Sequence, residues 1–110
     1  MKVKDLAEKY SMKILNAADI ETREARGCYC GDLLSWVMSR AEADDVWLTV
    51  MGNVNSIGVA VLADVACIIL TENAAFDADA MKRASENNVI VLQTEMNTYE
   101  TAVKVYEMLK

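Results

Sequence analysis

Two cysteines, Cys28 and Cys30, come closest in this sequence to a chemical site, and they stand two residues apart in the stretch GCYCGD. Side chains at that spacing in an extended strand point to the same face, where a disulfide between them would be strained. A structural zinc site needs four ligands, whereas the chain has only one further cysteine, Cys67, and no histidine. We therefore expect neither a metal nor a cofactor, and we keep Cys28 and Cys30 as the candidates if a metal does bind. The simpler alternative is that the thiols are buried as small apolar groups, while Gly27 and Gly31 mark a tight bend between a strand and a helix.

Polar residues follow three apolar segments of the chain and form a second candidate site. The segments cover residues 46–51, 66–72 and 89–95, and each precedes a segment with helical periodicity. This alternation predicts parallel strands joined by right-handed helical crossovers. The carboxyl ends of such strands meet at one edge, where open α/β sheets bind ligands. The expected ligand-binding residues are Gly52, Asn53, Asn55, Ser56, Thr71, Glu72, Asn73, Thr94 and Asn97, together with Arg23.

The chemistry of this edge restricts its ligand. Glu72 and Glu95 repel a bare phosphate unless Arg23, Arg26 or a divalent cation offsets them. Neither a Walker-type loop nor a GxGxxG pattern is present. We therefore expect a neutral, nucleoside-like group rather than a triphosphate. The alternative is that these asparagine, serine and threonine side chains only cap the helices that follow them.

Charge and composition exclude several classes of function. The formal net charge is −6 and the 11 Lys and Arg residues are scattered, which argues against nucleic acid and anionic membranes as partners. The lack of histidine excludes Ser-His and Cys-His catalysis within one chain. Carboxylates on turns are usually solvated caps, so we do not expect an enzyme. The candidates for an acid/base pair are Asp32, Asp44, Asp45, Glu72 and Glu95. An N-terminus without an apolar signal core and an odd number of cysteines favour a cytoplasmic protein with free thiols.

The pattern as a whole predicts one α/β domain over residues 1–110, in which helices cover both faces of a mainly parallel sheet as a three-layer structure. We expect a short helix at 3–10, a strand at 12–16, and later helices whose N-caps are Asp32, Asp77 and Asn97. Helical spacing predicts two inward-facing stripes, formed by Leu34, Val37, Met38 and Ala41 and by Ala102, Val103, Tyr106 and Leu109.

The segment IGVAVLAD, residues 57–64, is apolar on nearly every side. In a domain of this size such a helix is buried either by its own sheet and neighbours or by a partner. The second alternative predicts a homodimer.

Several longer stretches make the chain resemble the DRTGG-domain family, which is similar to the N-terminal domain of HPr kinase/phosphorylase. They are VKDLAEKYSMKIL, TREARGCYCGDLLSWVM, VWLTVMGNVNSIGVAVLADVACIIL, and the closing unit in which NVIVLQT precedes TYETAVKVYEML. The resemblance covers essentially all residues from 1 to 110. The name-giving motif is poorly kept, since the sequence has Thr22-Arg23 and Arg26-Gly27-Cys28 in its place, and only Arg23 and Gly27 carry over.

The resemblance implies a non-catalytic regulatory module. Such domains occur within phosphate acetyltransferases and beside CBS domains in regulatory pyrophosphatases, and HPr kinase keeps its phosphate-binding loop in a different domain. Stand-alone members look similar to small proteins associated with iron-only hydrogenases in anaerobes. Two hypotheses follow: a homodimeric module that binds a nucleotide or nucleoside-like molecule, and a redox or metal accessory of an iron-sulfur system that uses Cys28 and Cys30 and has a hydrogenase-related protein partner.

Overall fold

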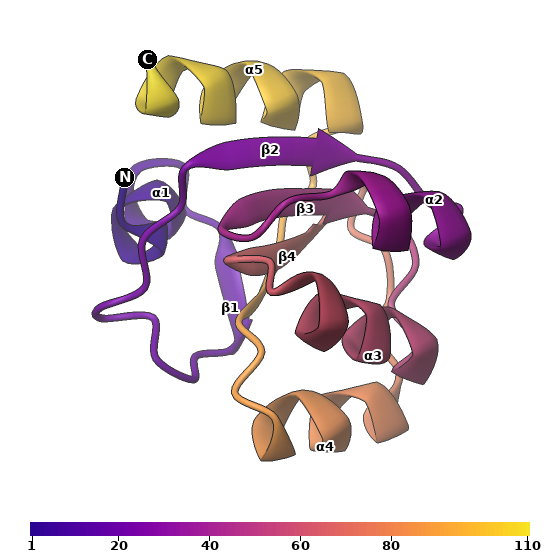
Figure 1. Cartoon of the computed structure of the whole chain (residues 1–110). Helices are drawn as coiled ribbons and strands as arrows, with labels where there is room; N and C mark the ends of the chain where they lie inside the picture. The colour runs from indigo at the N-terminus through magenta and orange to yellow at the C-terminus, as the bar shows by residue number, and fades with distance from the viewer.

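Five strands form one sheet in the order β1-β5-β4-β3-β2, in which β2 to β5 are parallel and β1 pairs antiparallel with β5 (Figure 1). The structure, a computed structural model, describes all residues from 1 to 110. The strands are β1 (Lys13–Asn16), β2 (Gly27–Cys30), β3 (Asp45–Thr49), β4 (Cys67–Leu70) and β5 (Val91–Gln93). The helices are α1 (Val3–Lys9), α2 (Leu34–Arg40), α3 (Val54–Ala63), α4 (Ala78–Glu86) and α5 (Thr98–Leu109).

The helices cover both faces of the sheet, which confirms the predicted three-layer α/β architecture. Crossover helices α2, α3 and α4 pack on one face, and α1 and α5 pack on the other (Figure 1). Strand β3 shows why, because its side chains alternate between the two cores: Val46 and Leu48 face α1 and α5, whereas Trp47 faces the crossover helices. All five residues of β3 are buried, as expected for a central parallel strand.

The junction between β2 and α2 differs from the prediction that Asp32 caps the helix. Helix α2 begins at Leu34, and no side chain caps it. The Asp32 carboxylate instead accepts hydrogen bonds from the Thr49 hydroxyl at 2.7 Å and the Val50 amide at 2.9 Å. Asp32 therefore joins the end of β2 to the end of β3.

The predicted inward stripes are only partly correct. In α2 Val37 is fully buried, but Met38 is exposed. In α5 the fully buried residues are Thr101 and Val105, and Tyr106 is 65% exposed. Helix α5 lies over β2 and β3, so its inward face is set by that contact, and Tyr106 falls on its flank.

Helix α3 combines a buried and an exposed apolar face. Ile57, Val59 and Ala60 are buried against the sheet. Val61 and Leu62 are 45% and 72% exposed, so the helix is not wholly enclosed by its own domain.

Candidate functional site

The loops that follow β3, β4 and β5 meet at the carboxyl edge of the sheet, as the sequence predicts. These three strands are neighbours and parallel. Backbone hydrogen bonds join the loops directly: the Asn73 amide donates to the Thr94 carbonyl at 2.8 Å, and the Glu72 amide donates to the Met96 carbonyl at 2.8 Å. The Asp77 amide donates to the Gly52 carbonyl at 2.9 Å. We call this region the carboxyl edge.

Several of the predicted binding residues act as helix caps. The Asn53 side chain accepts a hydrogen bond from the Ser56 amide at 3.0 Å at the start of α3. The Asn97 side chain accepts one from the Glu100 amide at 2.8 Å at the start of α5. The Ser56 hydroxyl donates to the Met51 carbonyl. These side chains stabilise the helix starts, which is the alternative that the sequence left open.

Other predicted residues hold the loops together. A Cβ on Gly52 would collide with the Ala75 carbonyl oxygen, so only glycine fits there. The hydroxyls of Thr71 and Thr98 are 2.8 Å apart and hydrogen-bonded. Asn55 is exposed on α3, and no hydrogen bond involves its side chain.

The backbone after β4 takes an unusual conformation. Glu72 and Asn73 are consecutive residues with left-handed φ values of 55° and 54°. Non-glycine residues are uncommon in this conformation, which costs on the order of 1–2 kcal/mol per residue, although asparagine tolerates it better. The turn holds the Asn73 side chain at the surface, where no hydrogen bond of the protein occupies it. The conformation is not confined to the carboxyl edge, since five other residues share it: Ser11, Ala18, Asp44, Asp64 and Asn88.

An open pocket of about 400 Å³ lies beside this turn. Its lining residues are Tyr10, Ser11, Lys13, Asn73, Gln93, Thr94, Glu95 and Met96. Of the predicted binding residues it therefore includes Asn73 and Thr94, and we call it the edge pocket.

Sequence reasoning missed the N-terminal wall of the edge pocket. Because β1 runs antiparallel to β5, its first residue, Lys13, lies opposite Gln93 at the end of β5. This pairing brings Tyr10 and Ser11 to the carboxyl edge as well. The only sign of this wall in the sequence was the predicted strand at 12–16. The sequence does not show which strand it pairs with, or whether the pairing is parallel or antiparallel.

Charges of both signs surround the edge pocket. Lys13 and Glu95 line it directly, and Glu72 follows β4 nearby. The ring of Tyr10 lies 5.7 Å from the ammonium groups of both Lys9 and Lys104. Lys13 of β1 is therefore the one cation that lines the pocket, in place of the expected Arg23 and Arg26.

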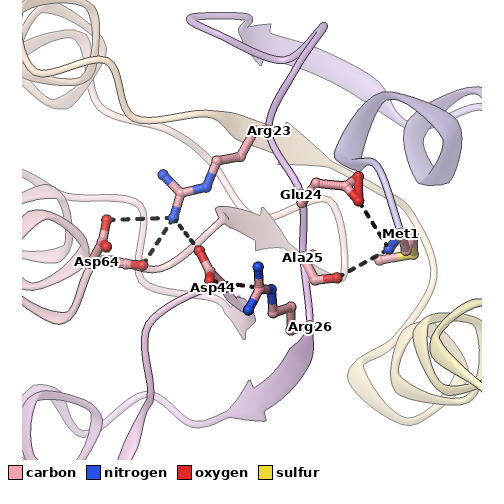
Figure 2. Close-up of polar contacts among 7 residues, drawn as sticks. All are labelled: Met1, Arg23, Glu24, Ala25, Arg26, Asp44 and Asp64. Carbon is pink, nitrogen blue, oxygen red and sulfur yellow. Dashed lines mark hydrogen bonds and ion pairs between the residues drawn. The ribbon is translucent and has the colours of Figure 1, made fainter.

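Arg23 and Arg26 lie at the opposite, amino edge of the sheet (Figure 2). The Arg23 guanidinium donates to the Asp44 carboxylate at 3.1 Å and to the Asp64 carbonyl at 3.1 Å, and it reaches the Asp64 carboxylate at 3.4 Å. Arg26 lies 3.7 Å from Asp44. Asp44 and Asp64 precede β3 and β4, so this cluster closes the amino ends of the strands. The structure does not bring Arg23 to the carboxyl edge.

The two neighbouring thiols are exposed on β2, so the expectation that they are buried was wrong. A hydrogen bond from the Cys28 thiol lowers the pKa of Cys30 to about 7, and the same contact raises the pKa of Cys28. Cys67 is buried in β4, which raises its pKa to about 12. No group of three or more potential metal ligands occurs in residues 1–110.

Comparisons with known proteins agree with this architecture. The structure is similar to that of the CBS and DRTGG domains of the regulatory region of Clostridium perfringens pyrophosphatase, solved in complex with its activator, diadenosine tetraphosphate. The TM-score is 0.73 at 11% sequence identity, and the match covers 94% of this chain and 45% of the other chain. This chain thus spans less than half the length of that one.

No curated protein is similar enough in sequence to count as a relative. None of the helices has both the length and the apolar composition that a bilayer crossing requires. The model of the DRTGG domain matches residues 5–108, and the chain belongs to the DRTGG-domain family.

Proposed function

We propose that this protein is a non-catalytic regulatory module that acts as a homodimer and binds a nucleotide or nucleoside-like molecule in the edge pocket. The observation that carries the proposal is the position of the pocket, at the carboxyl edge of a parallel sheet, where open α/β folds bind ligands. The similar pyrophosphatase region, which is regulatory and was solved with a nucleotide activator, supports the choice of ligand class.

The lining of the edge pocket suits such a ligand. Its volume of about 400 Å³ falls in the usual range for small-molecule sites, roughly 300–1,000 Å³. The Asn73 side chain offers an amide donor and an acceptor to a base or a ribose, and Tyr10 offers an aromatic ring. Lys13 offers one cation for a phosphate, while Glu95 disfavours a highly charged one. A nucleoside, or a nucleotide with few phosphates, therefore fits the charges of Lys13 and Glu95 in the edge pocket best.

A thermal-shift panel of adenosine, AMP, ATP and diadenosine tetraphosphate tests the proposal. A ligand present at 100 times its Kd stabilises the native state by about 2.7 kcal/mol, so the unfolding midpoint should rise with ligand concentration. The Asn73→Gly variant keeps the left-handed backbone and removes the side chain, and it should weaken the response. Asn55→Ala is the matched control, because Asn55 is an exposed asparagine outside the pocket. Equal responses in both variants would refute the edge pocket as the binding site.

A second candidate function is a redox or metal accessory of an iron-sulfur system, such as that of an iron-only hydrogenase. It is favoured by the exposure of Cys28 and Cys30 and by the low pKa of Cys30. Thiolates are the reactive and metal-binding form, and both proposals place the protein in the cytoplasm, where thiols stay reduced.

Anaerobic purification followed by metal analysis tests this second function. The Cys28→Ser/Cys30→Ser variant should lose any bound metal. Alkylation of Cys30 by iodoacetamide should accelerate as the pH rises through about 7, while Cys67 stays unmodified because it is buried. A metal-free protein whose double variant behaves normally removes this candidate.

A further inference from the structure

Strand β2 leaves one edge of the sheet open. It is the last strand of the sheet, and β3 is its only strand partner. No backbone or side-chain group outside the strand ladder is hydrogen-bonded to the backbone of Cys28 or Cys30. Unpaired edges attract further strands, and proteins usually protect them with charges or bulges.

The opposite edge of the sheet has such protection. Strand β1 begins with Lys13, and its register with β5 shifts between Ile14 and Asn16, as in a β-bulge. Within β2 itself there is no charged residue, and the strand reads Gly27-Cys28-Tyr29-Cys30. The two edges therefore differ, and β2 is the one that can accept another strand.

The sequence around β2 is symmetric about Tyr29. Residues 26–32 read Arg-Gly-Cys-Tyr-Cys-Gly-Asp, so the pattern is the same in both directions except that Arg26 and Asp32 exchange places. If two copies paired antiparallel with the two tyrosines opposite each other, Arg26 of each copy would lie opposite Asp32 of the other. The pairing would therefore contain two equivalent Arg26–Asp32 contacts. The edge is thus complementary in charge to itself. Arg26 is only loosely paired with Asp44, at 3.7 Å, and its side chain is 80% exposed. Asp32 accepts from Thr49 and Val50 of its own chain through one carboxylate oxygen, which leaves its second oxygen for Arg26 of the other copy.

The hydrogen-bonding direction of β2 suits the same register. The Gly31 amide donates to Leu48 of β3, and alternate residues of a strand bond to the same side, so within β2 Tyr29 also faces β3. The alternation begins at Gly27, because the Arg26 amide, just before the strand, donates to the Asp44 carbonyl. Cys28 and Cys30 therefore direct their backbone groups outward. In a pairing centred on Tyr29, Cys28 of one copy and Cys30 of the other form a hydrogen-bonded pair, and the reciprocal pair forms by symmetry.

Helix α5 presents an apolar flank on this side of the molecule. Lys104 lies on the flank near Tyr10 of the N-terminal region. Tyr99 and Tyr106, seven residues apart on the other flank, are 78% and 65% exposed, and α5 lies alongside β2 (Figure 1). A two-fold axis at Tyr29 places α5 of both copies on the same face of the extended sheet.

We propose that a second copy of this chain pairs antiparallel with β2, in a two-fold register centred on Tyr29 with Arg26 of each copy opposite Asp32 of the other. The two sheets then form one continuous sheet, with the α5 helices adjacent across the axis. The inference rests on the homodimer proposed above and identifies its surface, which is distinct from the exposed Val61 and Leu62 of α3.

Charge-reversed variants test this register by sedimentation. Arg26→Glu and Asp32→Lys each place like charges opposite each other in a homodimer, so each alone should dimerise at least about tenfold more weakly than the wild type. In a mixture of the two variants, the heterodimer has opposite charges at both contacts. Its affinity should therefore return toward that of the wild-type dimer. Asp32→Asn is the folding control, because it retains an oxygen acceptor for Thr49 and Val50. An Arg26→Glu variant that dimerises like the wild type overturns the surface, while the dimer itself stands.

Cross-linking gives an independent test. In a mixture of Cys28→Ser and Cys30→Ser chains, the remaining cysteines lie opposite each other only in mixed dimers. Mild oxidation should therefore join the two variants to each other more readily than either to itself, as measured by mass spectrometry. Equal yields overturn the register, and a wild type that sediments as one chain at micromolar concentration overturns both the register and the dimer. Ligand binding is measured separately by thermal shift, so its failure is distinguishable from these outcomes.

Discussion

The two ends of the parallel strands differ in how their polar side chains are used. At the amino edge Arg23 binds both Asp44 and Asp64, so the charges satisfy one another. At the carboxyl edge the caps and loop contacts use some side chains, but Asn73 lies unbonded at a pocket on a left-handed backbone. The backbone does not separate the two edges, because Asp44 and Asp64 also have left-handed φ values, of 69° and 55°. The difference lies in the side chains: those of the amino edge pair with one another and stabilise the fold, whereas the Asn73 side-chain amide at the pocket is unpaired.

This difference shows that polar residues near strand ends are not equivalent. Charged clusters that pair internally leave little for a ligand, whereas an unpaired amide beside a pocket retains its full hydrogen-bonding capacity. We therefore expect substitutions at the amino edge to change stability alone, and substitutions at the edge pocket to change ligand response.

The largest expected effect is that of Gly52→Ala at the carboxyl edge. The new methyl would collide with the Ala75 carbonyl oxygen, which belongs to the backbone and cannot swing away. Overpacking of this kind costs about 2–3 kcal/mol, measurable by urea unfolding. Gly58→Ala is the matched control, because nothing lies within 4 Å of the added group, and it should stabilise α3 by roughly 1 kcal/mol. A neutral Gly52→Ala would mean that the loops are not packed as described.

Arg23→Ala should lower the free energy of unfolding by about 1–2 kcal/mol, because it removes charge-assisted hydrogen bonds at a mostly buried guanidinium. Arg23→Lys should restore only part of the loss, since an ammonium cannot reproduce the planar set of donors. Neither variant should alter the ligand-induced shift of the unfolding midpoint. If Arg23→Ala abolished that shift while the protein remained folded, the separation between the two edges would be wrong.

The smallest effect is expected for Glu72→Gly, and it has the opposite sign. Glycine adopts a φ of 55° without the steric cost that glutamate carries, which stabilises the folded state. This gain is partly offset because glycine also has greater conformational freedom in the unfolded chain. The net gain should be up to about 1 kcal/mol in urea unfolding. A loss of stability would show that the turn depends on the Glu72 side chain rather than tolerating it.

The layers of the fold could be predicted from the sequence because they follow from local patterns. Continuous apolar runs such as the one at 66–72 can be buried on both faces only in a parallel sheet, and Asn97 caps α5 as its spacing indicates. Asp32 was misassigned because an aspartate before a helix has the same sequence signature whether it caps that helix or binds a neighbouring strand.

The site could be predicted only in part, because its two walls come from distant segments. Asn73 and Thr94 follow parallel strands and were predicted at the carboxyl edge. Tyr10 and Lys13 depend on the antiparallel pairing of β1, a contact between residues about 80 apart that no local pattern records. Arg23 was placed at the wrong edge because its partners, Asp44 and Asp64, are also distant in sequence.

An NMR titration of the ¹⁵N-labelled protein with AMP shows whether the edge pocket is the nucleotide-binding site. We expect concentration-dependent shifts of the amides of Ser11, Asn73 and Glu95 around the edge pocket, and unchanged amides at Arg23 and Asp44 on the amino edge. Shifts confined to the amino edge would contradict nucleotide binding at the edge pocket, and so would the absence of any saturable shift with both millimolar AMP and diadenosine tetraphosphate.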